Sequence, residues 1–378
     1  MKKVIEIALV GAPNSGKSTF FKALTLKDVK IADYPFTTIE PNEGTGFVTS
    51  KCPCKNEKSP DEECGNCLDG VRLVPLKVWD VAGLVKGAHE GRGRGNSFLD
   101  NVMQAEGLIH VLDMTGKTDE NGEAAEGHDP EETVKMLNEE IEYWMFNLIK
   151  KDAKLFSHSK DIVKTIGKRL SGLGINEMQI SKSVGNETSF NDEELLELCR
   201  RIRKRAKPIL IAGNKIDKED AEKNLGKLKE AIGTSGDYEL ALREANKIGL
   251  IKYIPGSRKF EEIKEAEGRQ RAGLAKMHEF LADKSTGVQE CMNKLVFDIL
   301  DYVVVYPVAN NDWTDSKGRK LPDALLMRNG STCVDLAYAI HDDIGKKFIT
   351  AIDAKSGKTV GGNYVLKDGD VISVRSGK

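Results

Sequence analysis

Short apolar runs alternate along the chain with longer stretches whose apolar residues recur every three or four positions. The short runs have the continuous hydrophobicity of strands that are buried on both faces, and the longer stretches have the period of amphipathic helices. This alternation predicts a mainly parallel sheet with crossover helices, and therefore an α/β fold. The strands that we expect are Val4–Val10, Val74–Trp79, Leu108–Asp113, Ile209–Ala212 and Ile251–Ile254.

Uneven gaps between these strands indicate two insertions. The first covers residues 50–70 and contains four cysteines, and the second covers residues 117–207. Asn191 and Glu194 form a capping-box pattern in the second insertion, and Pro208 disfavours helical geometry at Lys207. We expect a helical, coiled-coil hairpin with residues 171–189 as its loop. Its first two helices are predicted from the apolar series Val134, Leu137, Ile141, Trp144, Leu148 and Ile162, Ile166, Leu170, Leu173.

The pattern changes again from about Val303. A strand at Asp323–Met327, a turn at residues 328–330 and a short helix that ends at Ile340 indicate a small α+β module. Ser331 or Thr332 is the expected cap of that helix, and Tyr364–Leu366 and Val371–Val374 flank a further turn. The expected units are residues 1–116 and 208–302 for the two parts of the α/β domain, 117–207 for the helical insertion and 303–378 for the C-terminal module.

Composition limits the class of protein. The 378 residues are 39% hydrophobic and 31% charged, which excludes collagen-like and largely disordered classes. The net charge of −2 gives no global reason to expect a nucleic-acid or membrane partner, although a local patch could still bind one. No apolar run approaches the roughly 20 residues that a membrane span needs. Four of the seven cysteines cluster, which is typical of a metal site in a reducing compartment, so we expect a cytoplasmic protein, and a monomer.

Residues Gly11–Ser18 match the phosphate-binding pattern G-x-x-x-x-G-K-[ST], directly after an expected strand and before a helical pattern. Backbone N–H groups of such a loop surround phosphate oxygens, and a helix N-terminus adds favourable potential. Lys17 is expected to reach the β- and γ-phosphates, and the Ser18 hydroxyl to bind Mg²⁺. An ordinary glycine turn is the alternative. The expected phosphate contacts are Asn14, Ser15, Gly16, Lys17, Ser18 and Thr19.

Two later segments narrow the choice among kinases, ATPases and GTPases. Asp80 ends an expected strand, where its carboxylate can hold an Mg²⁺-bound water, and the Gly83 N–H can contact a γ-phosphate. Residues 214–217 form the pattern N-K-x-D, in which Asp217 can accept from the two ring-edge donors of guanine, Asn214 fixes the loop and Lys215 packs on the base. Gly256 and Ser257 are expected to form a weaker loop behind the base. For Asn214 and Asp217 an ordinary turn is the alternative.

With these motifs in place, the chain resembles the Obg-related branch of translation-factor-type GTPases, and most closely its YchF (Obg-like ATPase) subfamily. The resemblance covers nearly the whole chain and is carried by residues 32–42, Asp80–Ala88 and Gly91–Leu99. Residues 321–324 and 330–337 look like a TGS domain, a ubiquitin-like β-grasp module. The fold class implied is a P-loop NTPase G domain with a helical insertion and a C-terminal β-grasp domain.

The resemblance implies roles at matching positions. Thr38 would be the switch I threonine that closes on Mg²⁺ and the γ-phosphate, residues 84–97 would be switch II, and the helical insertion would be the family's coiled-coil arm. It also implies an association with ribosomes. Subfamily members that prefer ATP carry an altered base-recognition motif, whereas the N-K-x-D pattern is intact here, so we expect GTP. The cysteine insertion is not a general feature of the family.

The residues around the expected reaction centre predict slow hydrolysis of GTP to GDP. Leu84 stands where Ras-type enzymes carry a water-orienting glutamine, and a hydrophobic side chain cannot align water. Asn14 is a candidate ligand for K⁺, with bracing of the loop as the alternative. His110 and His89 are candidates to orient or deprotonate water, with a core role as the alternative for His110. Arg92 and Arg94 could act as an internal arginine finger or remain solvated.

Two further features suggest binding of other ligands. Cys52, Cys54, Cys64 and Cys67 have the C-x-C and C-x-x-C spacing of a four-cysteine zinc site, although free thiols or a redox disulfide would also fit. Six of the eight residues 200–207 are Lys or Arg, which complement a helix dipole or contact rRNA phosphates. We expect a Mg²⁺-dependent GTPase switch that binds ribosomal RNA or protein. An ATPase of the same fold and a non-hydrolysing RNA or ribosome adaptor are the alternatives.

Overall fold

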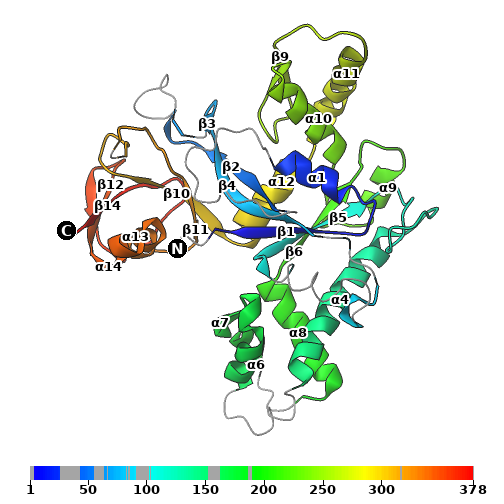
Figure 1. The fold of residues 1–378 in the computed structure, drawn as a ribbon, viewed down its shortest axis with the longest axis horizontal. Coiled ribbons are helices and arrows are strands. Elements are labelled where there is room, and N and C mark those ends of the chain that lie inside the picture. The colour runs from blue at the N-terminus through cyan, green and yellow to red at the C-terminus, as the bar shows by residue number, and fades with distance from the viewer. Residues whose placement is uncertain are drawn as a thin grey trace.

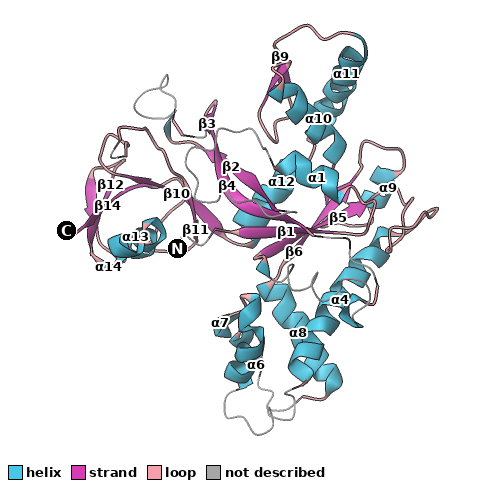
Figure 2. Ribbon diagram, in the orientation of Figure 1, coloured by secondary structure: helices cyan, strands magenta, loops and turns pink. Residues whose placement is uncertain are grey.

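The computed structural model describes residues 4–25, 43–54, 64–65, 67–81, 83, 86–90, 102, 104–151, 162–185, 190–315 and 317–377. Figure 1 shows a central sheet with helices on both sides, a helical extension on one side of it and a second, smaller sheet at the C-terminal end. Figure 2 separates the helices from the strands in the same view.

The central sheet has seven strands in the order β2-β4-β1-β5-β6-β7, and β3 also pairs with β4. Strands β4, β1, β5, β6 and β7 run parallel, whereas β2 and β3 are antiparallel to β4. Because parallel strands share one carboxyl edge, the residues that follow β1, β4, β5 and β6 lie at that edge. The strands are β1 (Glu6–Val10), β2 (Glu43–Lys51), β3 (Cys67–Leu68), β4 (Val71–Asp80), β5 (Gly107–Asp113), β6 (Ile209–Asn214) and β7 (Ile232–Thr234).

Helices bury both faces of this sheet. Ile7 and Leu9 belong to one core, and Ala8 and Val10 belong to another. The first core lies against α1, α10 and α12, and the second against α4 and α8, so the continuous apolar run of β1 has apolar neighbours on both sides. The helices of the first group are α1 (Lys17–Leu24), α10 (Gly236–Lys247) and α12 (Val288–Asn293), which continues as a π-helix over Lys294–Ile299; α9 (Ala221–Leu225) lies near β6 and β7.

The helical insertion contains the three expected helices. They are α4 (Pro130–Lys150), α6 (Ile162–Leu170) and α8 (Asp192–Ala206), with a 3₁₀ turn at Ser171–Leu173 and α7 (Glu177–Ser181) between the last two. The capping box at Asn191 and Glu194 is confirmed. Part of the expected loop 171–189 is helical instead, because Asn176 and Gln179 form a second capping box that starts α7. Figure 1 shows this insertion projecting away from the sheet.

The expectation that Ile251–Ile254 belongs to the parallel sheet is wrong. β8 (Ile251–Tyr253) pairs only with β9 (Phe260–Glu262) in a two-stranded sheet beside α10 and α11 (Gly268–Asp283). Lys252 is exposed between two buried neighbours, which is typical of a strand with one solvent-exposed face. The place next to β6 is taken by β7, whose three residues are too few to give a strand pattern.

The C-terminal module is a five-stranded mixed sheet in the order β11-β10-β14-β12-β13. The strand near Met327, the strand at Val371 and the helix cap at Thr332 are confirmed, the cap as a box with Asp335. Tyr364–Leu366 is not a strand, since only Val365 forms an isolated bridge, to Thr332. The elements are β10 (Tyr302–Val308), β11 (Leu325–Arg328), α13 (Cys333–Ile340), α14 (Asp342–Lys346), β12 (Phe348–Asp353), β13 (Lys358–Val360) and β14 (Val371–Ser376).

Among the described residues, every helix is too short or too polar to cross a bilayer.

Candidate functional site

The loop between β1 and α1 has the backbone of a phosphate cradle. Gly16 caps α1 with φ +90°, and Asn14 has φ +62°, so both adopt left-handed conformations. A side chain at Gly16 would also collide with the Asn214 amide, so glycine is required there for both reasons. The hydroxyl of Ser15 is buried and has no hydrogen-bond partner among the described residues. The loop therefore holds the first amides of α1 free at the carboxyl edge of the sheet.

Lys17 and Ser18 both bind the carboxylate of Asp80. The Lys17 ammonium lies 2.6 Å from Oδ1 of Asp80, and the Ser18 hydroxyl donates to Oδ2 at 3.1 Å. The parallel pairing of β1 with β4, with Leu9 opposite Asp80, places this carboxylate at the first turn of α1. An ammonium, a hydroxyl and a carboxylate thus converge on one point, and these are groups that a phosphate chain and a hard cation use.

The N-K-x-D loop after β6 is hydrogen-bonded directly to the phosphate loop. The Asn214 amide donates to the Ser15 carbonyl at 3.0 Å, and Lys215 donates to the Asn14 carbonyl at 2.8 Å. Lys215 also pairs with Asp113 at 2.7 Å, at the end of β5. Burial opposes ionisation of Asp113, but hydrogen bonds from Lys215, Thr115 and the Thr118 hydroxyl outweigh it and lower the pKa of the carboxyl. Sequence reasoning missed Asp113 because it lies in an otherwise apolar strand.

The loop after β7 supports the base-recognition residues from the other side. Ser235 donates to Oδ1 of Asp217 at 2.6 Å, and the Gly236 amide donates to the Asn214 side-chain oxygen at 3.0 Å. Lys218 pairs with the other oxygen of Asp217 at 2.8 Å. Gly256 and Ser257, the loop expected behind the base, follow β8 outside the main sheet, whereas Ser235 after β7 contacts Asp217 directly. The difference follows from the missed strand β7, since the loop is defined by the strand before it.

A loop that precedes the helices of the insertion and contains Thr118 and Gly122 contacts the phosphate loop. The Asn14 side-chain amide donates to the Gly122 carbonyl at 3.0 Å, and a side chain at Gly122 would collide with Pro13. Thr118 of the same loop donates to Asp113 at 2.6 Å. Gly83, on the opposite side, also packs against Pro13 closely enough that a β-carbon there would lie 2.9 Å from its ring. The phosphate loop is therefore held between the segments that follow β4 and β5.

A buried glutamate of α4 binds the segment after Gly83. Glu140 accepts from the amides of Gly87 at 2.6 Å and His89 at 2.9 Å, and its carboxylate lies 2.7 Å from Nδ1 of His89. The His89 ring stacks on Tyr143, one turn along α4. Burial opposes ionisation of Glu140, but the amides of Gly87 and His89 and the His89 ring outweigh it and lower its pKa. His89 is thus engaged with the helical insertion.

The structure places His110 inside the central sheet. It lies in β5 opposite Val10, and only 1% of its surface is exposed. Burial lowers its pKa to about 3, so the imidazole is neutral, and its Nδ1 has no partner among the described residues. This placement favours the core interpretation over activation of water.

Several expected site residues fall outside the described part of the chain. These are Thr38, Leu84, Arg92 and Arg94, together with most of residues 84–97.

The basic end of α8 is used largely inside the protein. Arg203 is buried and pairs with Glu142 of α4 at 2.9 Å, and Arg200 pairs with the same carboxylate at 3.2 Å. Lys207 is buried and donates to the Ala105 carbonyl at 2.6 Å. These contacts join α8 to α4 and to the sheet, so only Lys204 and Arg205 remain as well-exposed cations of this run.

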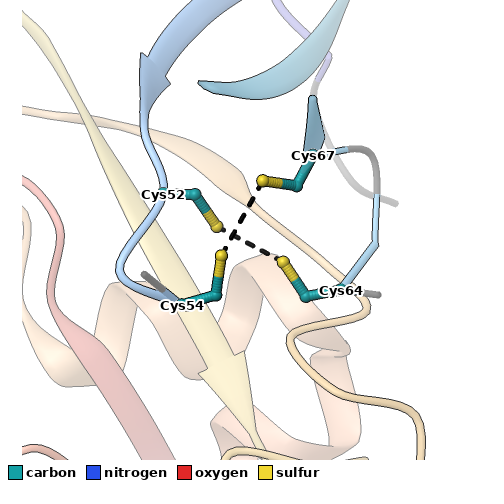
Figure 3. A group of neighbouring side chains, drawn as sticks. All are labelled: Cys52, Cys54, Cys64 and Cys67. Carbon is teal, nitrogen blue, oxygen red and sulfur yellow. Dashed lines mark hydrogen bonds between the residues drawn. The ribbon is translucent and has the colours of Figure 1, made fainter. Parts of the chain in front are cut away.

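The four clustered cysteines come together at the opposite end of β4 from Asp80. Their sulfur atoms point toward one another and all lie within 4.8 Å of each other (Figure 3).

The fold and the loops at its carboxyl edge define a P-loop nucleotide-binding protein. Residues 6–151, 212–310 and 317–376 match family models described as a 50S ribosome-binding GTPase, the G4 motif-containing domain of YGR210-like Obg-like GTPases, and a TGS domain.

Individual relatives agree with these matches. A GTP-binding protein of Methanocaldococcus jannaschii is 45% identical over 98% of both chains. The crystal structure of a GTP-binding protein from Pyrococcus horikoshii is 34% identical, with a TM-score of 0.76 over 98% of this chain and 100% of that one. The ribosome-binding ATPase YchF of Bacillus subtilis is 26% identical over 97% of this chain and 98% of its own. The chain belongs to the Obg-like, YchF-type family of P-loop GTP-binding proteins.

The Glu140 contacts give a first prediction. Glu140→Gln should raise amide hydrogen exchange at residues 87–90 about tenfold, because a neutral amide oxygen replaces a charged acceptor of two backbone N–H groups. Mass spectrometry of exchange in the full chain measures this directly. Glu139→Gln removes the neighbouring exposed carboxylate of α4 and should leave the segment unchanged. Equal protection in both variants would contradict the role given to Glu140.

Proposed function

We propose that this protein binds GTP with Mg²⁺ and hydrolyses it slowly to GDP. The observation that carries the proposal is the direct hydrogen bonding of the N-K-x-D loop to the phosphate loop, through Asn214 to Ser15 and Lys215 to Asn14. These hydrogen bonds join the loop that would bind the base to the loop that would bind the phosphates, so the distance between base and phosphate chain would be fixed. Asp217 then faces the base edge and Lys17 the phosphates.

The base preference follows from Asp217. Its carboxylate is buried, accepts a hydrogen bond from Ser235 and lies 2.8 Å from the Lys218 ammonium, so it is oriented before a ligand arrives. A carboxylate accepts hydrogen bonds only, and guanine offers a ring N–H and an amino group side by side on one edge. Adenine presents an unprotonated ring nitrogen there, which would oppose the charge. The intact motif therefore supports GTP over ATP.

The phosphate and metal groups are provided by the other half of the site. Lys17 would leave Asp80 for the β- and γ-phosphates, and Ser18 with Thr38 would bind Mg²⁺, with Asp80 contacting it through water. The donor set fits a hard cation, since it consists of hydroxyl and carboxylate oxygens at the end of a helix whose dipole favours phosphate. Bound Mg²⁺ would neutralise charge that develops on the phosphate oxygens. The Gly83 amide would contact the γ-phosphate, and the close packing of Gly83 on Pro13 of the phosphate loop supports this role.

Water activation is the weak point of this site. Leu84 cannot orient water, and buried, neutral His110 is not available to a solvent molecule. We therefore expect unassisted turnover of about 10⁻⁴–10⁻² s⁻¹, the range of GTPase switches that act without a partner protein. Assistance would come from K⁺ at Asn14 or from a bound partner. The hydrogen bond from the Asn14 side-chain amide to the Gly122 carbonyl supports a bracing role for Asn14. The same hydrogen bond fixes the orientation of the side-chain oxygen of Asn14.

The partner proposed from the family is the ribosome. One matching family is described as a 50S ribosome-binding GTPase, and the Bacillus subtilis relative is a ribosome-binding ATPase. The helical insertion is the part of the described chain that projects furthest from the sheet on the side of α4 (Figure 1). Because Arg200, Arg203 and Lys207 are engaged internally, contact with rRNA through this run would depend on Lys204 and Arg205.

Nucleotide calorimetry tests the base preference. We expect GDP and GTP to bind at least about 100-fold more tightly than ADP and ATP, because the wrong base leaves the buried Asp217 unmatched. Asp217→Asn should weaken GDP binding by about the same factor and improve binding of xanthine nucleotides, whose edge offers an oxygen in place of the amino group. Asp220→Asn, an exposed carboxylate three residues away, should bind GDP like the unmodified chain. ATP binding equal to or tighter than GTP binding would replace this proposal with an ATPase of the same fold.

Single-turnover hydrolysis in KCl and in NaCl tests the chemistry. Measurable GDP formation that is lost in Lys17→Ala would support an enzyme and exclude a non-hydrolysing adaptor. A rate several-fold higher in KCl, with the difference lost in Asn14→Ala while GDP affinity is kept, would support K⁺ at Asn14. Equal rates in both salts would count against K⁺ and leave the partner as the source of assistance.

A further inference from the structure

We propose that Cys52, Cys54, Cys64 and Cys67 bind one Zn²⁺ whose role is to fix the C-terminal β-grasp domain against the β2–β4 end of the G domain. This site is separate from the nucleotide site. β4 has ten residues, with the cysteine cluster beside its start and Asp80 at its end, which places the two sites about 30 Å apart.

The sulfur geometry fits a tetrahedral ion. Sγ of Cys52 lies 3.5 Å from Sγ of Cys64, and Sγ of Cys54 lies 3.8 Å from Sγ of Cys67. A disulfide requires about 2.05 Å, so these thiols are not bonded to each other. Four sulfurs about 2.3 Å from one zinc ion stand about 3.8 Å apart at the corners of a tetrahedron. Figure 3 shows the line between Cys52 and Cys64 crossing the line between Cys54 and Cys67, as opposite edges of a tetrahedron do.

The local backbone brings the two cysteine pairs together. Cys52 and Cys54 follow the end of β2, and Cys67 begins β3. β3 returns into β4 through Asp69 and Gly70, both with positive φ, as a two-residue hairpin turn requires. The Cys52 amide donates to the Gly70 carbonyl at 2.8 Å, which holds the first pair beside this turn. Four soft thiols from closed turns leave no open position for a substrate, which is typical of structural zinc.

A buried arginine provides the positive charge that such a centre needs. Four thiolates and one Zn²⁺ carry a net charge of −2, and Arg72 lies opposite Cys67 in the β3–β4 pairing. Its side chain is 1% exposed, and its guanidinium packs on Gly65, where any side chain would collide with it. Nε and Nη1 have no hydrogen-bond partner among the described residues. A buried guanidinium is costly unless negative charge lies close by, and a tetrathiolate centre would supply that charge.

The same arginine reaches the C-terminal domain. Nη2 of Arg72 donates to the Pro322 carbonyl at 3.1 Å, and its guanidinium lies 5.7 Å from the centre of the Tyr306 ring. The Tyr306 hydroxyl donates to the Lys51 carbonyl at 3.5 Å, next to Cys52. Cys52, Cys54 and Cys64 belong to one continuous core with residues of the C-terminal domain, among them Val304, Tyr306, Trp313 and Leu321. The cysteine turns are therefore part of the contact between the two domains.

Zinc would stabilise this contact because the cysteine segment has few apolar residues to fold around. Metal ligation would fix the turns that carry Cys52 and Gly65. The first turn then holds the Lys51 carbonyl near Tyr306, and the second holds the Arg72 guanidinium near Pro322. Loss of the metal should therefore loosen β10 while leaving the far side of the C-terminal sheet intact.

Metal analysis of the full chain tests the site. The purified protein should contain about one equivalent of zinc, and Cys64→Ala should lose most of it. Cys199→Ala, a buried cysteine in α8, should keep the full content. Replacement by Co²⁺ should give the visible bands of a tetrahedral thiolate site. A protein without metal, with free thiols or a Cys52–Cys64 disulfide by non-reducing mass spectrometry, would overturn the proposal, as would an iron–sulfur chromophore.

Hydrogen exchange tests the domain contact. In Cys64→Ala, amides of residues 302–308 should exchange about tenfold faster or more, whereas those of β12 and β13 should not change. Arg72→Met should loosen the same residues, and Cys199→Ala should match the unmodified chain. Unchanged exchange at 302–308 in the metal-free variant would overturn the docking role. GDP affinity should be unaffected in Cys64→Ala, so a failure of the GTP proposal would be seen separately.

Discussion

The hydrogen bonds between two loops of distant sequence hold this site together. Ser15 and Asn14 offer carbonyl groups that no strand uses, and Asn214 and Lys215 reach across the ends of two parallel strands to bind them. Each of these donors has a second anchor: Asn214 is held by Gly236, and Lys215 by Asp113. The parallel sheet matters because it brings the ends of β1, β5 and β6 to one edge, where the side chains of Asn214 and Lys215 can make these contacts.

The fold and the site could be predicted from the sequence where the hydrophobic pattern and a local motif indicate the same element. The phosphate loop, the N-K-x-D loop and the capping box at Asn191 are local signals, and the elements around them were found. β7 was missed because Ile232, Gly233 and Thr234 show no periodicity, and the strand forms only through pairing with β6. That error moved the loop behind the base to Gly256, when Ser235 is the residue that contacts Asp217. Contacts such as Glu140 with His89 depend on tertiary approach and leave no signal in a single sequence.

The helical insertion contacts the nucleotide edge at two places. Its first loop touches Asn14 and Asp113, and Glu140 of α4 holds the segment after Gly83. The charged residues of α8 that suggest a surface for RNA instead fasten α8 to α4 through Glu142. A buried carboxylate with two guanidinium partners also fixes the relative register of these helices, since any slip would leave a charge unpaired. The described part of the insertion is therefore attached to this edge of the sheet at both places.

β4 connects the cysteine site to the phosphate loop and has a functional side chain near each end. It begins beside Arg72, which touches the C-terminal domain, and finishes at Asp80, which touches the phosphate loop. β4 pairs with β2 along almost its whole length, with β3 at its start and with β1 at its end. Its two ends lie about 30 Å apart, beyond the roughly 8 Å over which exposed charges act at physiological salt, so the charge at Asp80 can change while the electrostatic environment of Arg72 stays the same.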